Sequence, residues 1–181
     1  MGYGEPSTVI EHERDSAKVN VFCAISSRKF YGPFSFSERS VTSNVYRDII
    51  EVWLMPQLHS VSTDYIFQQD GAPPHWSTEV RSFLNQHLPK LWIGRSGDVD
   101  DVFCSWPLRS PDLTPCDFFL WGYVKDRVYV PPMPKTIEEL KVCICNALAS
   151  VTEQMLQNVW REMDYRLYVV RVTKGSHIEH L

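Results

Sequence analysis

The sequence predicts an α/β fold in a single domain that takes in residues 1–181, with residues 131–181 as its C-terminal helical part. Two observations support this prediction. Short runs rich in β-branched and aromatic residues alternate with longer stretches whose apolar residues recur every three or four positions. With 44% hydrophobic and 22% charged residues, the chain can also bury a core of its own.

The first elements expected are a β-hairpin and a helix. Residues 19–25 and 30–36 are two β-rich runs with a turn between them, which predicts the hairpin. Thr42 or Ser43 can then cap an amphipathic helix. We expect this helix to end near Pro56, because proline removes a helical hydrogen bond.

The middle of the chain predicts two further strands around a helix. Residues 65–69 and 91–94 are short apolar strands, and the helix between them begins at Ser77 and stops before Pro89. Residues 95–105 are expected to form a loop. Its acids lack the spacing of a calcium loop and are expected to be solvated: Asp98, Asp100 and Asp101.

Prolines at positions 107, 111 and 115 predict an extended segment before the next helix. The helix is expected to begin only at Pro115, with Thr114 as its N-cap. Asp117 then occupies the third helical position, where its carboxylate can complete a capping box. After a proline-rich break, Thr136 and Thr152 each predict the start of a helix.

Asp70 is the first candidate for a functional acid, because it ends the strand over residues 65–69. Ligand crevices in open α/β sheets form at the carboxyl ends of strands, so this position suits chemistry. Taken alone, an aspartate at a strand end is more often a turn former. Asp70 and Asp117 together are more specific than either acid alone.

Two motifs resemble the catalytic core of mariner-type transposases of the Tc/mariner superfamily. Residues 69–75 read Gln-Asp-Gly-Ala-Pro-Pro-His, and residues 109–122 read Arg-Ser-Pro-Asp-Leu-Thr-Pro-Cys-Asp-Phe-Phe-Leu-Trp-Gly. The resemblance implies a ribonuclease-H-like fold, a mixed sheet flanked by helices, with a triad of acids of the DDE/D type. By that resemblance Asp70 is the second acid and Asp117 the third.

The resemblance also implies that one acid is missing. In the family the first acid lies on the first strand of the domain, and residues 1–5 resemble the segment just after that strand. The domain is therefore expected to be incomplete at its N-terminus and the chain as given to be inactive. Without the strand, residues 19–25 and 65–69 are expected either to pair directly or to keep free edges.

Transposases of this class, by the same resemblance, cut and join DNA strands with two divalent ions, Mg²⁺ or Mn²⁺. Asp70 and Asp117 would be metal ligands, with weak or no binding in the absence of the first acid. The candidate DNA contacts are His75, Arg109, Lys125 and Arg127. His75 could instead orient a carboxylate or cap the next helix.

Composition limits the possible partners. A net charge of -4 and a pI near 5.8 argue against a whole-surface nucleic-acid binder, so any DNA contact must be local. Five cysteines without framework spacing fit reduced thiols, and no apolar run approaches the ~20 residues of a membrane span. We expect a nuclear protein that acts on DNA, with a possible homodimer and without a small-molecule substrate.

Two alternatives to a transposase enzyme remain open from the sequence. One is a domesticated module that binds nucleic acid or protein without catalysis, and salt-dependent DNA affinity without a metal requirement would favour it. The other is a transposon remnant without function, which predicts poor folding and no specific partner.

Overall fold

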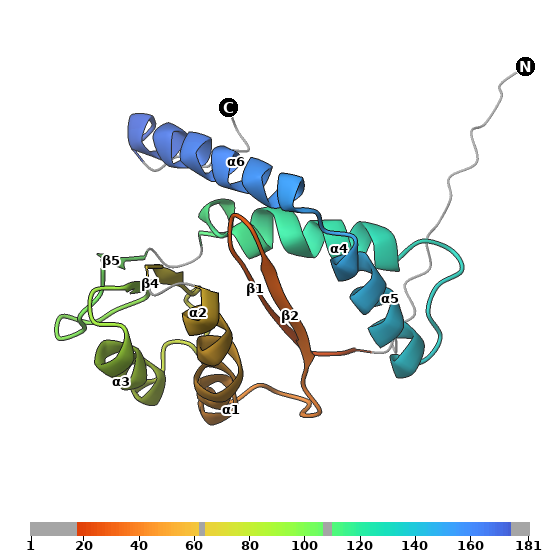
Figure 1. Ribbon diagram of the computed structural model, residues 1–181, viewed down its shortest axis with the longest axis horizontal. Coiled ribbons are helices and arrows are strands. Elements are labelled where there is room, and N and C mark those ends of the chain that lie inside the picture. Colours follow the sequence, from red (N-terminus) through yellow and green to blue (C-terminus); the bar gives the residue numbers. More distant parts are fainter. Residues whose placement is uncertain (1–17, 62–63, 107–109, 175–181) are drawn as a thin grey trace, which may run out of the picture.

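The computed structural model describes residues 18–61, 64–106 and 110–174. Strands and helices alternate along these residues, as the α/β prediction requires (Figure 1). The lead-in over residues 1–17, the candidate Arg109 and the tail over residues 175–181 lie outside the described residues.

A β-hairpin crosses the middle of the molecule (Figure 1). β1 (Val21–Ile25) pairs antiparallel with β2 (Phe30–Ser35), which confirms the predicted hairpin. Side chains of a strand alternate between its two faces. Phe22 therefore packs against one hydrophobic cluster, and Cys23 is buried in another. The hairpin thus lies between two parts of the core.

The first cluster is built on a long helical stretch. α1 (Ser43–Asp48), η1 (Ile49–Leu54) and α2 (Met55–Val61) follow one another without a break, and the Thr42 side chain caps α1 as predicted. The expected end near Pro56 is wrong. η1 is π-helical, with the Met55 N–H donating to the Ile50 carbonyl, and this wider turn accommodates a residue that lacks an N–H.

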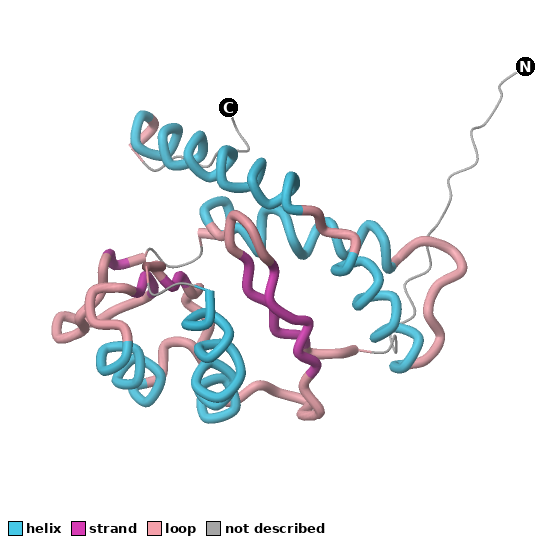
Figure 2. Tube along the Cα trace, viewed as in Figure 1, coloured by secondary structure: helices cyan, strands magenta, loops and turns pink. Residues whose placement is uncertain are grey.

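A parallel sheet of three short strands lies beside this stretch. Its order is β3 (Phe67–Gln68), β4 (Trp92–Gly94) and β5 (Cys104–Ser105), drawn in magenta in Figure 2. The segment over residues 95–105 was expected to be loop throughout, but its end forms β5. The N–H groups of Phe103 and Trp106 donate to β4 carbonyls, so this end is held to the sheet.

The two sheets stay separate within the described residues. β1 pairs only with β2, and β3 pairs only with β4, so β1 and β3 do not pair directly. Of the two expected outcomes, the structure therefore has free edges on both strands. The helix α3 (Thr78–His87) packs in the first cluster next to the parallel sheet, with Ser77 as its N-cap.

The helix after the proline-rich segment begins at Pro115, as predicted, but without the predicted side-chain cap. A short 3-10 turn, η2 (Pro111–Leu113), precedes η3 (Cys116–Leu120) and α4 (Trp121–Val128). The Thr114 hydroxyl donates to the Ser110 carbonyl and does not cap the helix. The Thr114 carbonyl instead accepts the N–H of Asp117. The predicted side-chain cap at Thr114 is therefore wrong.

Two more helices complete the fold. α5 (Ile137–Ala149) and α6 (Glu153–Val172) begin at the predicted caps, because the side chains of Thr136 and Thr152 accept N–H groups in their first turns. α5 packs against α4 and β2 to form the second cluster. α6 lies along η2, where Arg166 donates to the Asp112 carbonyl (Figure 1).

Two expectations from composition concern membrane spans and thiols. Within residues 18–61, 64–106 and 110–174, every helix is too short or too polar to cross a bilayer. All five cysteines are free: Cys23, Cys104, Cys116, Cys143 and Cys145.

Candidate functional site

Asp70 and Asp117 line the same cavity, although 46 residues separate them in the chain. The cavity has a volume of about 610 Å³ and lies at the carboxyl end of β3. Asp70 follows that strand directly, and Asp117 comes from the first turn of η3. The fold therefore presents both candidate acids to one space, on two different elements.

Asp70 is held by two hydrogen bonds to one of its oxygens. His75 Nδ1 lies 2.5 Å from Asp70 Oδ1, and the Ala72 N–H donates to the same atom at 2.9 Å. Burial opposes the charged form of Asp70, but the hydrogen bond and charge of His75 outweigh it and lower the pKa of the carboxyl. Asp70 is thus ionised at neutral pH and oriented through Oδ1.

His75 is itself fixed by its neighbours. Its ring stacks on the ring of Tyr46, with centroids 3.8 Å apart. Tyr46 donates its hydroxyl to Gln69 Oε1 at 3.1 Å, and Gln69 Nε2 donates to the His75 carbonyl at 3.0 Å. Gln69 is only 5% exposed. The histidine therefore orients a carboxylate, which is one of the roles considered for it from the sequence.

Asp117 lies in an environment that disfavours its charge. Burial and the negative charge of Asp70 raise the pKa of its carboxyl, and the positive charge of Lys125 offsets this only in part. η3 begins without a side-chain cap, so Asp117 does not form the predicted capping box. Two carboxylates that repel one another across a cavity form an arrangement that a cation stabilises.

The donor chemistry of this pair fits a hard divalent cation. Mg²⁺ and Mn²⁺ prefer oxygen ligands, and Mg²⁺ is commonly held by one or two carboxylates together with water and substrate phosphate. Among the described residues, no group of three or more metal-ligating side chains gathers at one point. Asp70 and Asp117 are therefore the described carboxylates on this cavity that would hold such an ion.

The other predicted site residues are placed less centrally. Lys125 is close enough to influence the Asp117 carboxyl but does not line the cavity. Arg127 lies over the Tyr123 ring, with its guanidinium carbon 3.5 Å from the centroid, and donates to the Tyr123 carbonyl. The structure therefore brings together Asp70, His75 and Asp117, while DNA contacts by Lys125 and Arg127 stay predictions.

Four residues of the site were not singled out from the sequence as functional. Tyr46 and Gln69 support His75, and Arg95 and Trp106 line the cavity. The sequence did contain a signal for Gln69. A polar amide is unusual in a buried strand, and here it lies next to the acid that ends the strand. Tyr46 and Arg95 gave none, since only the fold brings them to the site.

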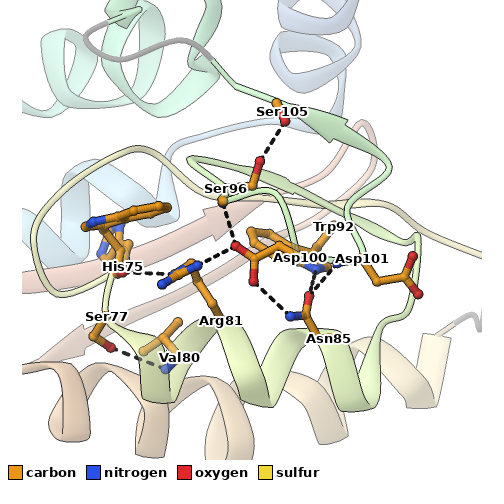
Figure 3. Close-up of polar contacts among 12 residues, drawn as sticks. His75, Ser77, Val80, Arg81, Asn85, Trp92, Ser96, Asp100, Asp101 and Ser105 are labelled. Atoms are coloured by element: carbon orange, nitrogen blue, oxygen red, sulfur yellow. Dashed lines mark hydrogen bonds and ion pairs between the residues drawn. The ribbon is translucent and has the colours of Figure 1, made fainter.

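An ion pair and several hydrogen bonds join α3 to the loop that follows β4 (Figure 3). Arg81 Nη1 lies 2.5 Å from Asp100 Oδ2, and Asn85 donates to Asp100 Oδ1 at 2.9 Å. The Asp100 side chain is only 3% exposed, so its predicted solvation is wrong. The residue lies in a loop that folds back onto α3, and sequence spacing does not reveal this contact.

Comparison with protein-family models finds no match. The curated relatives are transposases of nematodes. The transposable element Tc3 transposase of Caenorhabditis elegans is 29% identical over 178 residues, which cover 97% of this chain and 50% of that protein. The Tcb2 transposase of Caenorhabditis briggsae is 34% identical over 86 residues, which cover 46% of this chain and 26% of that protein. The chain thus spans about half the length of the first relative.

Solved structures share the fold. The Mos1 strand transfer complex matches with a TM-score of 0.76 and 17% identity, over 98% of this chain and 49% of that chain. The Mos1 transposase catalytic domain with raltegravir and Mg matches with a TM-score of 0.66 and 16% identity, over 85% of this chain and 74% of that one. These matches confirm the expected ribonuclease-H-like fold.

Proposed function

We propose that the chain is the catalytic domain of a Tc/mariner transposase, the type of domain that cleaves and joins DNA strands with a divalent metal ion. The observation that supports this proposal best is the pair of carboxylates on one cavity, Asp70 and Asp117. Their positions match those of the second and third acids in the motifs, and they come from a strand end and a helix start.

Asp70 and Asp117 are the residues that would hold Mg²⁺ or Mn²⁺. When bound, such an ion polarises a phosphoryl oxygen and favours the ionised form of an attacking hydroxyl. The protein's own contribution is to fix the ligands in advance. His75 and the Ala72 N–H orient Asp70, and the mutual repulsion of the two acids favours the binding of a cation.

The proposed substrate is DNA, and the proposed location is the nucleus, where that substrate is found. Negative net charge restricts the contact to the region around the cavity. Self-association into a homodimer stays a prediction, and the mass of the purified chain in solution tests it.

DNA binding with and without Mg²⁺ tests the proposed function. We expect the purified chain to bind a labelled DNA duplex more tightly when Mg²⁺ is present, because an ion held by Asp70 and Asp117 would offset their repulsion of the phosphates. The double variant Asp70→Asn, Asp117→Asn should lose this dependence on Mg²⁺. Salt-dependent binding without any effect of Mg²⁺ would favour a binding module without catalysis, and absence of DNA binding would contradict the proposal.

Plasmid nicking tests the expectation that the chain as given is inactive. We expect no conversion of supercoiled to relaxed plasmid by the purified chain in Mg²⁺ or Mn²⁺. Nicking that depends on either ion and that Asp70→Ala abolishes would overturn this expectation, while it would strengthen the assignment of Asp70.

Removal of His75 is expected to weaken metal binding. The change His75→Ala takes away the group that orients Asp70, and loss of such supporting groups commonly lowers metal affinity about 10- to 100-fold. His75→Asn should restore part of the affinity, because its amide can donate to Asp70. Titration with Mn²⁺, followed by the paramagnetic resonance of the free ion, measures this. Equal affinity of His75→Ala and the wild type would contradict the orienting role.

A further inference from the structure

We propose that Arg95 binds a backbone phosphate of the DNA and anchors it in the cavity in front of Asp70 and Asp117. This inference rests on the proposed function, because it concerns how the same site takes its substrate. Arg95 follows β4 directly and lines the cavity together with the two acids. It is the one cationic side chain among the described residues that line this cavity.

Arg95 and its neighbour Arg81 differ in whether a carboxylate pairs with them. Arg81 is paired with the buried carboxylate of Asp100. Within the described part of the chain, Arg95 forms no ion pair with any carboxylate. Arg81 thus serves the structure of the loop, whereas the Arg95 guanidinium keeps its charge available to a ligand.

Trp76 holds the Arg95 side chain in position. The guanidinium carbon of Arg95 lies 4.3 Å from the centroid of the Trp76 ring, and that of Arg81 lies 4.1 Å from it. A guanidinium over an aromatic ring uses its face for that contact. Its N–H groups lie in the guanidinium plane and are not used by this contact, and their fork matches two oxygens of a phosphate. Stacking therefore preorganises Arg95 as a phosphate donor.

The electrostatics of the cavity call for such a residue. Two carboxylates line the cavity, and among the described lining residues Arg95 alone is positively charged. A phosphodiester that approaches them is repelled unless positive charge is nearby. A divalent ion supplies charge at the acids themselves, and Arg95 supplies it on the β4 side, so the substrate is held from two directions.

Trp106 supports this placement of the substrate. It lines the same cavity, and its buried indole Nε1 has no hydrogen-bond partner among the residues that the structure describes. A buried indole N–H usually has an acceptor. A phosphate or sugar oxygen held by Arg95 in this cavity would be a suitable acceptor for it.

The salt dependence of DNA binding tests the role of Arg95. Affinity for a labelled DNA duplex is measured in Mg²⁺ over a range of KCl concentrations for the wild type, Arg95→Gln, Arg95→Lys and the control Arg28→Gln. Loss of one phosphate contact lowers the slope of log K against log salt by about 1. Of the variants, only Arg95→Gln is expected to show this decrease in slope. Its affinity for DNA should also fall about tenfold.

The other variants separate charge from structure. Arg95→Lys should keep the slope, because it keeps the charge, but should bind more weakly than the wild type, because it loses the fork. Arg28 lies in the exposed turn of the hairpin, so its variant should match the wild type. Thermal unfolding of each variant shows whether it is folded.

Three results would overturn the proposed role of Arg95. A slope in Arg95→Gln equal to that of Arg28→Gln, with Mg²⁺-dependent DNA binding intact, overturns the role of Arg95 and leaves the proposed function standing. If Arg95→Lys reduces the slope of log K against log salt as much as Arg95→Gln does, the role of Arg95 is structural. That result also overturns the proposed phosphate contact. Absence of DNA binding by the wild type contradicts both proposals.

Discussion

Replacing Asp117 with Asn is expected to abolish the stabilisation of the protein by Mn²⁺. A ligand that binds only the folded state stabilises it by about 2.7 kcal/mol at one hundred times its dissociation constant. Asp117 contributes one of two carboxylates that face the cavity, and an amide is a much weaker ligand for a hard cation. The melting temperature with and without Mn²⁺ measures the effect.

The same variant should be at least as stable as the wild type when Mn²⁺ is absent. Burial and the charge of Asp70 raise the pKa of the Asp117 carboxyl, so its ionised form opposes folding at neutral pH. For an acid with a raised pKa, stability falls as the pH rises above the ordinary value. Asn removes this cost. An Asp117→Asn variant that is less stable without Mn²⁺ but still gains from Mn²⁺ would contradict the assignment.

Asp126 provides the matched control. It is an exposed aspartate on α4, a few residues beyond Asp117, and it does not line the cavity. Asp126→Asn should show the full stabilisation by Mn²⁺. An equal loss in both variants would indicate a general effect of negative charge rather than a site.

Replacing Asp100 with Ala is expected to destabilise the fold by about 3 kcal/mol, because removal of one partner of a buried ion pair leaves the other charge unpaired. The Asp100 carboxylate accepts hydrogen bonds from Arg81, Asn85 and the Gly97 N–H. Chemical denaturation at neutral pH measures the loss. Asp98→Ala, at an exposed position of the same loop, should change stability little.

The effect of Asp100 should depend on pH in a defined direction. Burial opposes its charge, but hydrogen bonds from the Gly97 N–H, Asn85 and Arg81 outweigh burial and lower the pKa. Such a group stabilises the fold above the ordinary aspartate pKa of about 4, and the stabilisation is lost as the pH falls through the lowered value. The difference between wild type and Asp100→Ala should therefore shrink below about pH 4. A constant difference down to pH 2 would contradict this account.

Local signals in the sequence predicted most of the elements. Alternation predicted the hairpin, and the hydroxyl side chains of Thr42, Ser77, Thr136 and Thr152 marked helix starts that the structure has. These signals succeed because a cap or a strand face depends on residues close in the chain. The prediction that the helix ends near Pro56 failed, because a π-helical turn before Pro56 lets the helix continue.

Contacts between distant segments account for what the sequence did not predict. The motifs indicated Asp70 and Asp117, but the ring of Tyr46 reaches His75 only through the packing of α1 against α3. Arg95 and Asp100 gave no local signal either. Their roles depend on Trp76, which lies just before α3, and on Arg81, which lies within that helix.

A crystal of the protein soaked in Mn²⁺ tests the central claim most directly, because the anomalous signal of manganese locates the ion without assumptions about ligands. We expect a peak between the carboxylates of Asp70 and Asp117, and no such peak in crystals of Asp117→Asn. Manganese bound elsewhere, with no peak within coordination distance of either aspartate at saturating Mn²⁺, would contradict the claim that these acids form a metal site.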